Sequence, residues 1–139
     1  PENSHVLAAL IRKFHEAKMS NMSEVTIWGT GTPLREFLHV DDLASAVEFL
    51  LNNYDQPDTI NIGSGDEVSI NELASLIAEA VGFDGNIVQD PSRPDGTPRK
   101  ILDSSKLHDL GWKPAWKLRD GITDAYAWFV ENHDDVRSV

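Results

Sequence analysis

The sequence predicts an α/β fold, because short β-branched segments alternate with longer segments in which apolar residues recur at helical spacing. Turn-forming glycines and prolines separate these segments, and polar capping residues precede the helical ones. At 139 residues, 40% of them hydrophobic, the chain is long enough for one domain with a buried core. We therefore expect a single domain over residues 1–139, without an internal repeat.

The first half of the chain contains a helical pattern, two strand-like segments joined by a tight turn, and a second helical pattern. These lie at residues 6–14, 25–28, 36–40 and 41–51, respectively. The expected N-cap of the first helix is Asn3 or Ser4. Asp41 and Asp42 are expected to cap the second helix and to complement its dipole. Its apolar positions are Leu43, Ala46, Val47, Leu50 and Leu51.

The second half predicts two strands and three helices. The strands are expected at residues 59–62 and 86–89, and the helices at 69–82, 105–110 and 118–132. Ser69 and Glu72 form a capping-box pattern, and Gly82 is the expected end of that helix. Ser104 or Ser105 is expected to cap the short helix before Gly111.

Composition excludes several classes of partner. With 12 Lys and Arg against 23 Asp and Glu, the net charge is −11, which disfavours nucleic acid and anionic membrane surfaces. No apolar run approaches the roughly 20 residues that span a bilayer. The absence of cysteine excludes a disulfide scaffold and fits a reducing compartment. We expect a cytoplasmic protein.

Two loops concentrate cations in this acidic chain. The segments are WGTGTPLREFLHVDD at residues 28–42 and RPDGTPRK at residues 93–100. Arg35, Arg99 and Lys100 suit a small anion such as a nucleoside diphosphate, and Trp28 offers a flat face for a base or sugar. Taken singly, Trp28 also fits a core tryptophan and Arg35 a surface charge. Their spacing of seven residues across a predicted hairpin favours a shared role.

Three other positions leave alternatives open. Asp95 is favoured by turn chemistry alone, and it equally suits hydrogen bonds to a ribose or a guanine edge. His5 is expected in the first turn of a helix, where the dipole disfavours the protonated ring. Such a histidine can exchange protons near neutral pH, although an exposed or capping role fits equally. His39, Asp41 and Asp42 are close in sequence but alternate in direction, so we expect no metal site.

A complete catalytic constellation is absent from the sequence. The glycine pairs at residues 29–31 and 63–65 lack the rest of a dinucleotide fingerprint and are interpreted as turns. Neither Tyr54 nor Tyr126 is followed four residues later by lysine. No nucleophile elbow and no zinc-protease helix occurs.

The two loops, together with NSHV (3–6), RKFHEA (12–17), LGW (110–112) and YAWF (126–129), resemble the GDP-L-fucose synthase family of extended short-chain dehydrogenases. That family converts GDP-4-keto-6-deoxy-mannose to GDP-L-fucose by epimerisation and NADPH-dependent reduction. The resemblance implies that residues 1–139 form its C-terminal, nucleotide-sugar-binding domain, a small lobe of short strands alternating with helices. It assigns substrate contacts as follows: Lys13, Trp28, Arg35, Asp95 and Lys100. His5 would be the catalytic acid beside the nicotinamide.

The same resemblance implies that essential parts lie outside this sequence. The glycine-rich NADP loop, the Tyr and Lys used in reduction and the cysteine paired with the catalytic histidine belong to an N-terminal Rossmann domain. The chain alone is therefore expected to be inactive, and the family homodimer would form through that domain. The apolar residues of the 41–51 helix are expected to pack against it and to be uncovered in isolation. Two alternatives are the lobe of another NDP-sugar epimerase or dehydratase, and a non-catalytic module that binds a protein.

Overall fold

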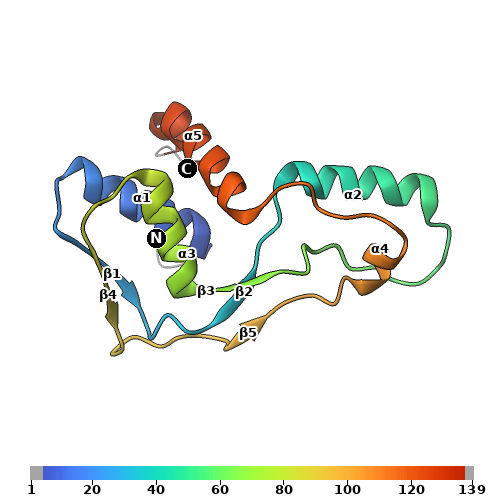
Figure 1. Cartoon of the computed structure of the whole chain (residues 1–139), viewed down its shortest axis with the longest axis horizontal. Coiled ribbons are helices and arrows are strands. Elements are labelled where there is room, and N and C mark those ends of the chain that lie inside the picture. The colour runs from blue at the N-terminus through green and yellow to red at the C-terminus, as the bar shows by residue number, and fades with distance from the viewer. Residues whose placement is uncertain (1–4, 137–139) are drawn as a thin grey trace.

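The computed structural model describes the backbone of residues 5–136 and the side chains of residues 5–132. In chain order its elements are α1 (Val6–Met19), β1 (Glu24–Trp28), β2 (Leu34–Glu36), α2 (Val40–Asn53), β3 (Glu67–Ser69), α3 (Ile70–Val81), β4 (Asn86–Asp90), β5 (Arg99–Lys100), α4 (Ser105–Asp109) and α5 (Leu118–Val136) (Figure 1). This mixture of short strands and helices confirms the predicted α/β class. None of the helices within residues 5–136 is both long and apolar enough to cross a membrane.

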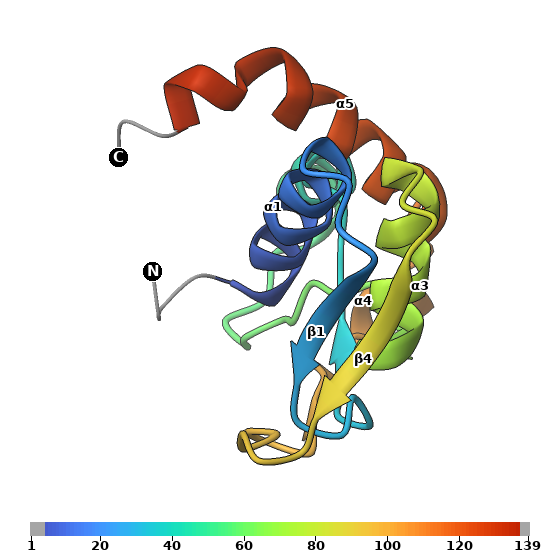
Figure 2. The same ribbon diagram turned by 90° about the vertical axis from the view of Figure 1, so that its left-hand side faces the viewer.

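The main core lies where α1 and α3 pack against each other and against the β1–β4 pair. Phe14, Leu73 and Ile77 are fully enclosed there, and the ring of Phe14 meets that of Phe83 edge-on at 5.5 Å between centroids. Helix α5 crosses over the ends of α1 and α3 (Figure 2) and adds Ile122 to the same cluster. This core fixes the strand β1 that leads into the first cationic loop.

The strands form two separate small sheets. In one, β1 pairs with β4 in parallel, from Glu24 opposite Asn86 to Trp28 opposite Asp90. In the other, β2 is the central strand, antiparallel to β3 and parallel to β5. Figure 1 shows the β1–β4 pair at one end of the molecule and the second sheet towards its middle.

The predicted hairpin of strands 25–28 and 36–40 is wrong, because β1 and β2 belong to different sheets. The turn at residues 29–33 carries the chain from one sheet to the other. The second strand is also shorter and earlier than expected, and residues 37–39 continue without a ladder into α2. Residues 59–62 were expected to form a strand and have no strand pairing within residues 5–136.

The termini of one helix are those that the sequence predicts, and the capping of three other helices differs from the prediction. The capping box of Ser69 and Glu72 starts α3, and Gly82 ends it in the left-handed conformation, as expected. Helix α2 is capped by His39, whose side chain accepts from the Asp41 N–H, so the expected Asp41 and Asp42 caps are wrong. Ser104 occupies the N-cap of α4, as expected, but its side chain makes no capping bond.

The third difference is at α1. Its N-cap is His5, which makes no side-chain capping bond. His5 thus precedes the first turn rather than lying in it. The proposed caps Asn3 and Ser4 lie outside the described residues.

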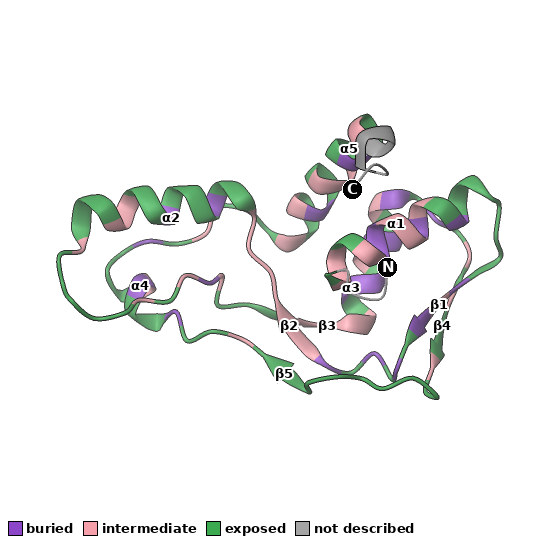
Figure 3. Cartoon of the chain, turned by 180° about the vertical axis from the view of Figure 1, so that it is seen from behind, coloured by how far each residue is buried: buried purple, intermediate pink, exposed green. Residues whose placement is uncertain are grey.

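Helix α2 packs against the second, smaller apolar cluster through one face only. Ala46 and Leu50 join Leu107 and Trp112 there. The adjoining face is open to solvent and carries an apolar stripe of Val40 (69% exposed), Leu43 (45%), Val47 (45%) and Leu51 (82%). Figure 3 shows α2 exposed along most of its length. The expected uncovering of this helix is confirmed for these residues, whereas Ala46 and Leu50 are packed.

Candidate functional site: a pair of unpaired cations beside a clamped loop

Two cations lie side by side on one face of the three-stranded sheet. Arg35 of β2 is directly opposite Lys100 of β5, and directly opposite residues of neighbouring strands share a face. Like charges in this arrangement repel. Within residues 5–132 neither side chain has an ion-pair partner, and Arg35 Nη1 donates only to the Leu34 carbonyl, at 2.7 Å. An anion between the two side chains would offset this repulsion.

Arg99 differs from its neighbour because it points to the other face of the sheet. Its Nε donates to Glu67 Oε2 at 2.8 Å. This contact raises the pKa of the Arg99 guanidinium above its usual value. The sequence placed Arg99 among the candidate anion ligands; the structure pairs it with Glu67 on the face away from Arg35 and Lys100.

The loop at residues 93–97 is fixed to the turn after β1 by Asp95. Its carboxylate accepts from the Thr30 backbone N–H at 2.6 Å and from the Thr30 hydroxyl at 2.9 Å. Gly29, at φ 78°, has no room for a Cβ, which would lie 2.1 Å from Asp95 Oδ1. Asp95 therefore has a structural role, and its solvent-exposed carboxylate keeps acceptor capacity for a ligand.

Trp28 is at the end of β1 and is 56% exposed, which excludes the core alternative. The guanidinium of Arg93 lies over its ring, 5.1 Å from the centroid. Arg93 also approaches Asp90 at 4.0 Å. Hydrogen bonds from the Ser92 hydroxyl and backbone N–H lower the pKa of the Asp90 carboxyl, which keeps it charged beside Arg93. Trp28 and Arg93 thus form a stacked pair at the edge of the cationic loop.

Lys13 and His5 come from α1 and are less closely connected to the sheet. The Lys13 ammonium donates to the Thr26 carbonyl of β1, two residues before Trp28. His5 is exposed at the start of the helix. No hydrogen bond or ion pair among the described residues joins His5 to the other five candidates. The structure therefore connects Trp28 and Asp95 through adjoining loops, and Arg35 and Lys100 through the sheet register.

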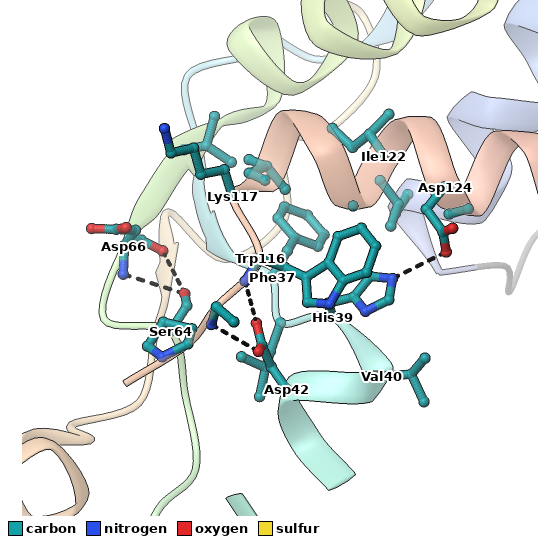
Figure 4. Close-up of a pocket in the computed structure, with 18 of the residues that line it drawn as sticks. Phe37, His39, Val40, Asp42, Ser64, Asp66, Trp116, Lys117, Ile122 and Asp124 are labelled. Carbon is teal, nitrogen blue, oxygen red and sulfur yellow. Dashed lines mark hydrogen bonds and ion pairs between the residues drawn. The ribbon is translucent and has the colours of Figure 1, made fainter. Parts of the chain in front are cut away.

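A separate cavity of about 710 Å³ opens between α2, α5 and the start of α1 (Figure 4). The His39 ring stacks on Trp116 at 4.0 Å between centroids, and His39 Nε2 lies 3.2 Å from Asp124 Oδ2. Because Nδ1 accepts from the Asp41 N–H, the proton is on Nε2 and donates to Asp124. Leu7 lines this cavity, two residues after His5, and none of the six predicted site residues does.

Sequence reasoning missed three residues that shape the cationic site. Thr30 holds Asp95, Arg93 covers Trp28, and Glu36 binds backbone N–H groups of two neighbouring segments. Arg93 was visible as a further cation of its loop. Glu36 and Thr30 carried no signal, because their partners lie far along the chain. Among the side chains of residues 5–132, no group of three or more His, Asp or Glu has the arrangement of a metal site.

Comparison with known proteins finds a matching family model and several close relatives in sequence. The model of the NAD dependent epimerase/dehydratase family matches residues 1–63. A probable GDP-L-fucose synthase 1 of Oryza sativa subsp. japonica is 62% identical over 132 residues, covering 95% of this chain. The GDP-L-fucose synthase of Escherichia coli (strain K12) is 48% identical over 146 residues, covering 99% of this chain. The chain is similar to GDP-L-fucose synthases over nearly all of its length.

The likeness extends to solved structures and covers only part of each relative. A GDP-L-fucose synthetase from Naegleria fowleri superposes with a TM-score of 0.88 at 31% identity, covering 96% of this chain and 41% of that one. The same protein bound to NADP gives 0.86 at 30% identity. The chain spans 40% of the Oryza sequence and 46% of the Escherichia coli sequence. It is thus similar to one part of the GDP-L-fucose synthases.

Proposed function

We propose that this chain is the nucleotide-sugar-binding lobe of an NADP-dependent epimerase/reductase that converts GDP-4-keto-6-deoxy-mannose to GDP-L-fucose. The observation that carries the proposal is the unpaired couple of Arg35 and Lys100 on one sheet face. A diphosphate has the charge and the oxygen spacing to bridge two adjacent cations, and arginine binds it with two parallel hydrogen bonds. The names of the relatives supply the GDP-sugar and the cofactor.

The other predicted residues take roles around that diphosphate. Trp28 supplies the flat surface for the base or sugar, with Arg93 stacked on it. Asp95 holds the loop in place and offers its remaining acceptor capacity to ribose hydroxyls or a guanine edge. Lys13 stabilises the strand that leads to Trp28 and adds positive charge beside it.

His5 is proposed as the acid that returns a proton to the epimerised carbon. Its exposed position at the N-terminus of α1 leaves the ring accessible to a substrate. NADP, when bound, supplies the hydride that reduces the keto group. We propose that it binds mainly to an N-terminal Rossmann domain and meets this chain near His5. We propose that the apolar stripe on α2 faces that domain. The homodimer is proposed to form through the Rossmann domain, and the enzyme to act in the cytoplasm.

Titration calorimetry tests the diphosphate site directly. We expect this chain to bind GDP more tightly than UDP, and Arg35→Ala to weaken GDP binding by roughly 10- to 100-fold, since charge-assisted hydrogen bonds contribute about 1.5–3 kcal/mol. Arg119→Ala is the matched control, because Arg119 is paired with Glu79 on the surface formed by α3 and α5. Equal losses in both variants would remove the support that the cation pair gives to this function.

A further inference from the structure

Glu36 lies next to Arg35 on β2 and binds the backbone of two segments that flank the sheet. Its Oε1 accepts from the Gly65 N–H at 2.8 Å and from the Ser64 hydroxyl at 3.4 Å. Its Oε2 accepts from the Leu102 N–H at 3.1 Å. Both carboxylate oxygens are therefore used, one on each side of the strand.

These bonds begin where the sheet ladders end. The pairing of β2 with β5 stops at Arg35 opposite Lys100, and Leu102 lies two residues further on. The pairing of β2 with β3 stops at Glu36 opposite Glu67, and Gly65 lies two residues before Glu67. The Glu36 side chain therefore extends both ladders and clamps a sheet whose outer strand β5 has only two residues.

Local packing indicates that the Glu36 carboxylate is held in a specific position and is not simply a surface charge. Gly63 is buried against it, and a Cβ at that position would lie 2.6 Å from Glu36 Oε1. Glu36 also lies opposite Glu67, an unfavourable pair of like charges. Arg99 neutralises Glu67, whereas the N–H groups of Gly65 and Leu102 stabilise Glu36.

We propose that Glu36 is a positioning residue for diphosphate binding, an inference that rests on the proposed function. Strand alternation places its carboxylate on the face opposite Arg35 and Lys100. From that side it fixes the segment that follows Lys100 and so holds the two cations at a constant separation. A diphosphate then meets a preformed pair and loses less free energy to ordering the loops.

The sign of a charge-removing substitution distinguishes positioning from simple electrostatics. Glu36→Gln removes one negative charge near the cation pair, so electrostatics alone predicts tighter binding of an anion. Positioning predicts weaker binding, because an amide has one acceptor oxygen and leaves either Gly65 or Leu102 without its partner. Glu67→Gln makes the same charge change on the same sheet face and serves as the matched control. It weakens the contact with Arg99 but leaves Glu36 bound to the Gly65 and Leu102 N–H groups.

The experiment measures binding of GDP and of inorganic pyrophosphate to this chain by calorimetry. We expect Glu36→Gln to weaken both by about tenfold, corresponding to the loss of one hydrogen bond to a charged group. We expect Glu67→Gln to leave binding unchanged or tighter. Glu36→Asp keeps the charge but is one methylene shorter, and we expect it to weaken binding as well. Equal or tighter binding by both Glu36 variants overturns the inference.

Amide hydrogen exchange separates this inference from the function on which it rests. In the folded Glu36 variants we expect faster exchange of the Gly65 and Leu102 amides, with the core of α3 unchanged. Unchanged exchange at both amides overturns the clamp, whatever the binding result. If the unsubstituted chain binds neither ligand, the proposed function and the ligand part of the inference both fail, and exchange alone then decides whether the clamp exists.

Discussion

Asp42 is the buried carboxylate on which the attachment of α2 to the rest of the chain depends. It is 3% exposed and lies in the first turn of the helix. Its Oδ1 accepts from the Ala115 N–H at 2.8 Å, and its Oδ2 accepts from the Trp116 N–H at 3.1 Å. The connection before α5 is thereby fixed to the start of α2, and Asp42→Ala removes both bonds.

The size of the effect follows from those two bonds. Each hydrogen bond to a charged acceptor contributes about 1.5–3 kcal/mol, and water reaches the freed N–H groups because Ala115 and Trp116 are exposed. Allowing for partial hydration of the loop, we expect Asp42→Ala to lower the free energy of unfolding by about 3–5 kcal/mol. Asp42→Asn retains one acceptor oxygen and should cost about half as much.

Urea denaturation followed by circular dichroism measures this loss. With a slope of about 2 kcal/mol per M urea, the midpoint should fall by roughly 1.5–2.5 M for Asp42→Ala. Asp41→Asn is the control, since Asp41 lies in the same helical turn but is exposed, and its loss costs only the dipole interaction of about 0.3–1 kcal/mol. A midpoint for Asp42→Ala no lower than that of Asp41→Asn would refute the reasoning.

Three further predictions concern other parts of the chain. Ser69→Ala should lower the free energy of unfolding by about 1 kcal/mol, measured in urea, because it removes the cap of α3. Hydrogen bonds from the Ser69 backbone N–H and from its hydroxyl lower the pKa of the Glu72 carboxyl, so their contribution is present above the usual glutamate pKa and is lost as pH falls through the folded value. Because Ser69→Ala keeps the backbone N–H and removes only the hydroxyl, a pH series should show a smaller loss in this variant than in the unsubstituted chain. Phe14→Ala should cost about 3–5 kcal/mol, since the fully buried ring leaves a cavity beside Phe83, and a smaller loss in thermal unfolding would indicate that the core refills. Leu51→Glu should reduce concentration-dependent self-association in analytical ultracentrifugation. If the unsubstituted chain is a monomer at all concentrations, the apolar stripe on α2 does not mediate self-association.

Local patterns in the sequence predicted those elements whose determinants lie within a few residues. The capping box at Ser69 and the left-handed Gly82 define α3 by contacts within that helix, and both were predicted. The error at residues 36–40 has a different cause. A β-branched or aromatic segment can be extended with or without a neighbouring strand, and whether it joins a sheet depends on partner strands elsewhere in the chain.

The same limit explains the false hairpin and the missing strand at residues 59–62. A tight turn between two extended segments is compatible with a hairpin or with passage between two sheets, and only the partners β4 and β5 decide. In residues 59–62 the side chains of Ile60 and Ile62 pack on the second cluster, so the apolar signal was real although no ladder forms.

For the site, the sequence identified the cations but not how they are grouped. Arg99 and Lys100 are equivalent as neighbouring basic residues, yet strand alternation sends the first to Glu67 and the second to the face of Arg35. That distinction requires the register of β5, which no local signal encodes. The clamp by Glu36 was hidden for the same reason.

The contacts that assemble the cationic face link residues far apart in the chain. Thr30 and Asp95 are separated by 65 positions, and Glu36 and Leu102 by 66. During synthesis at 5–20 residues per second, Arg35 must therefore wait roughly 3–13 s before its neighbours on β5 exist. Throughout that interval the nascent chain lacks the site, so nucleotide cannot stabilise the chain by binding. In a refolding experiment, nucleotide binding should appear only when the long-range contacts form, which is the last step of folding.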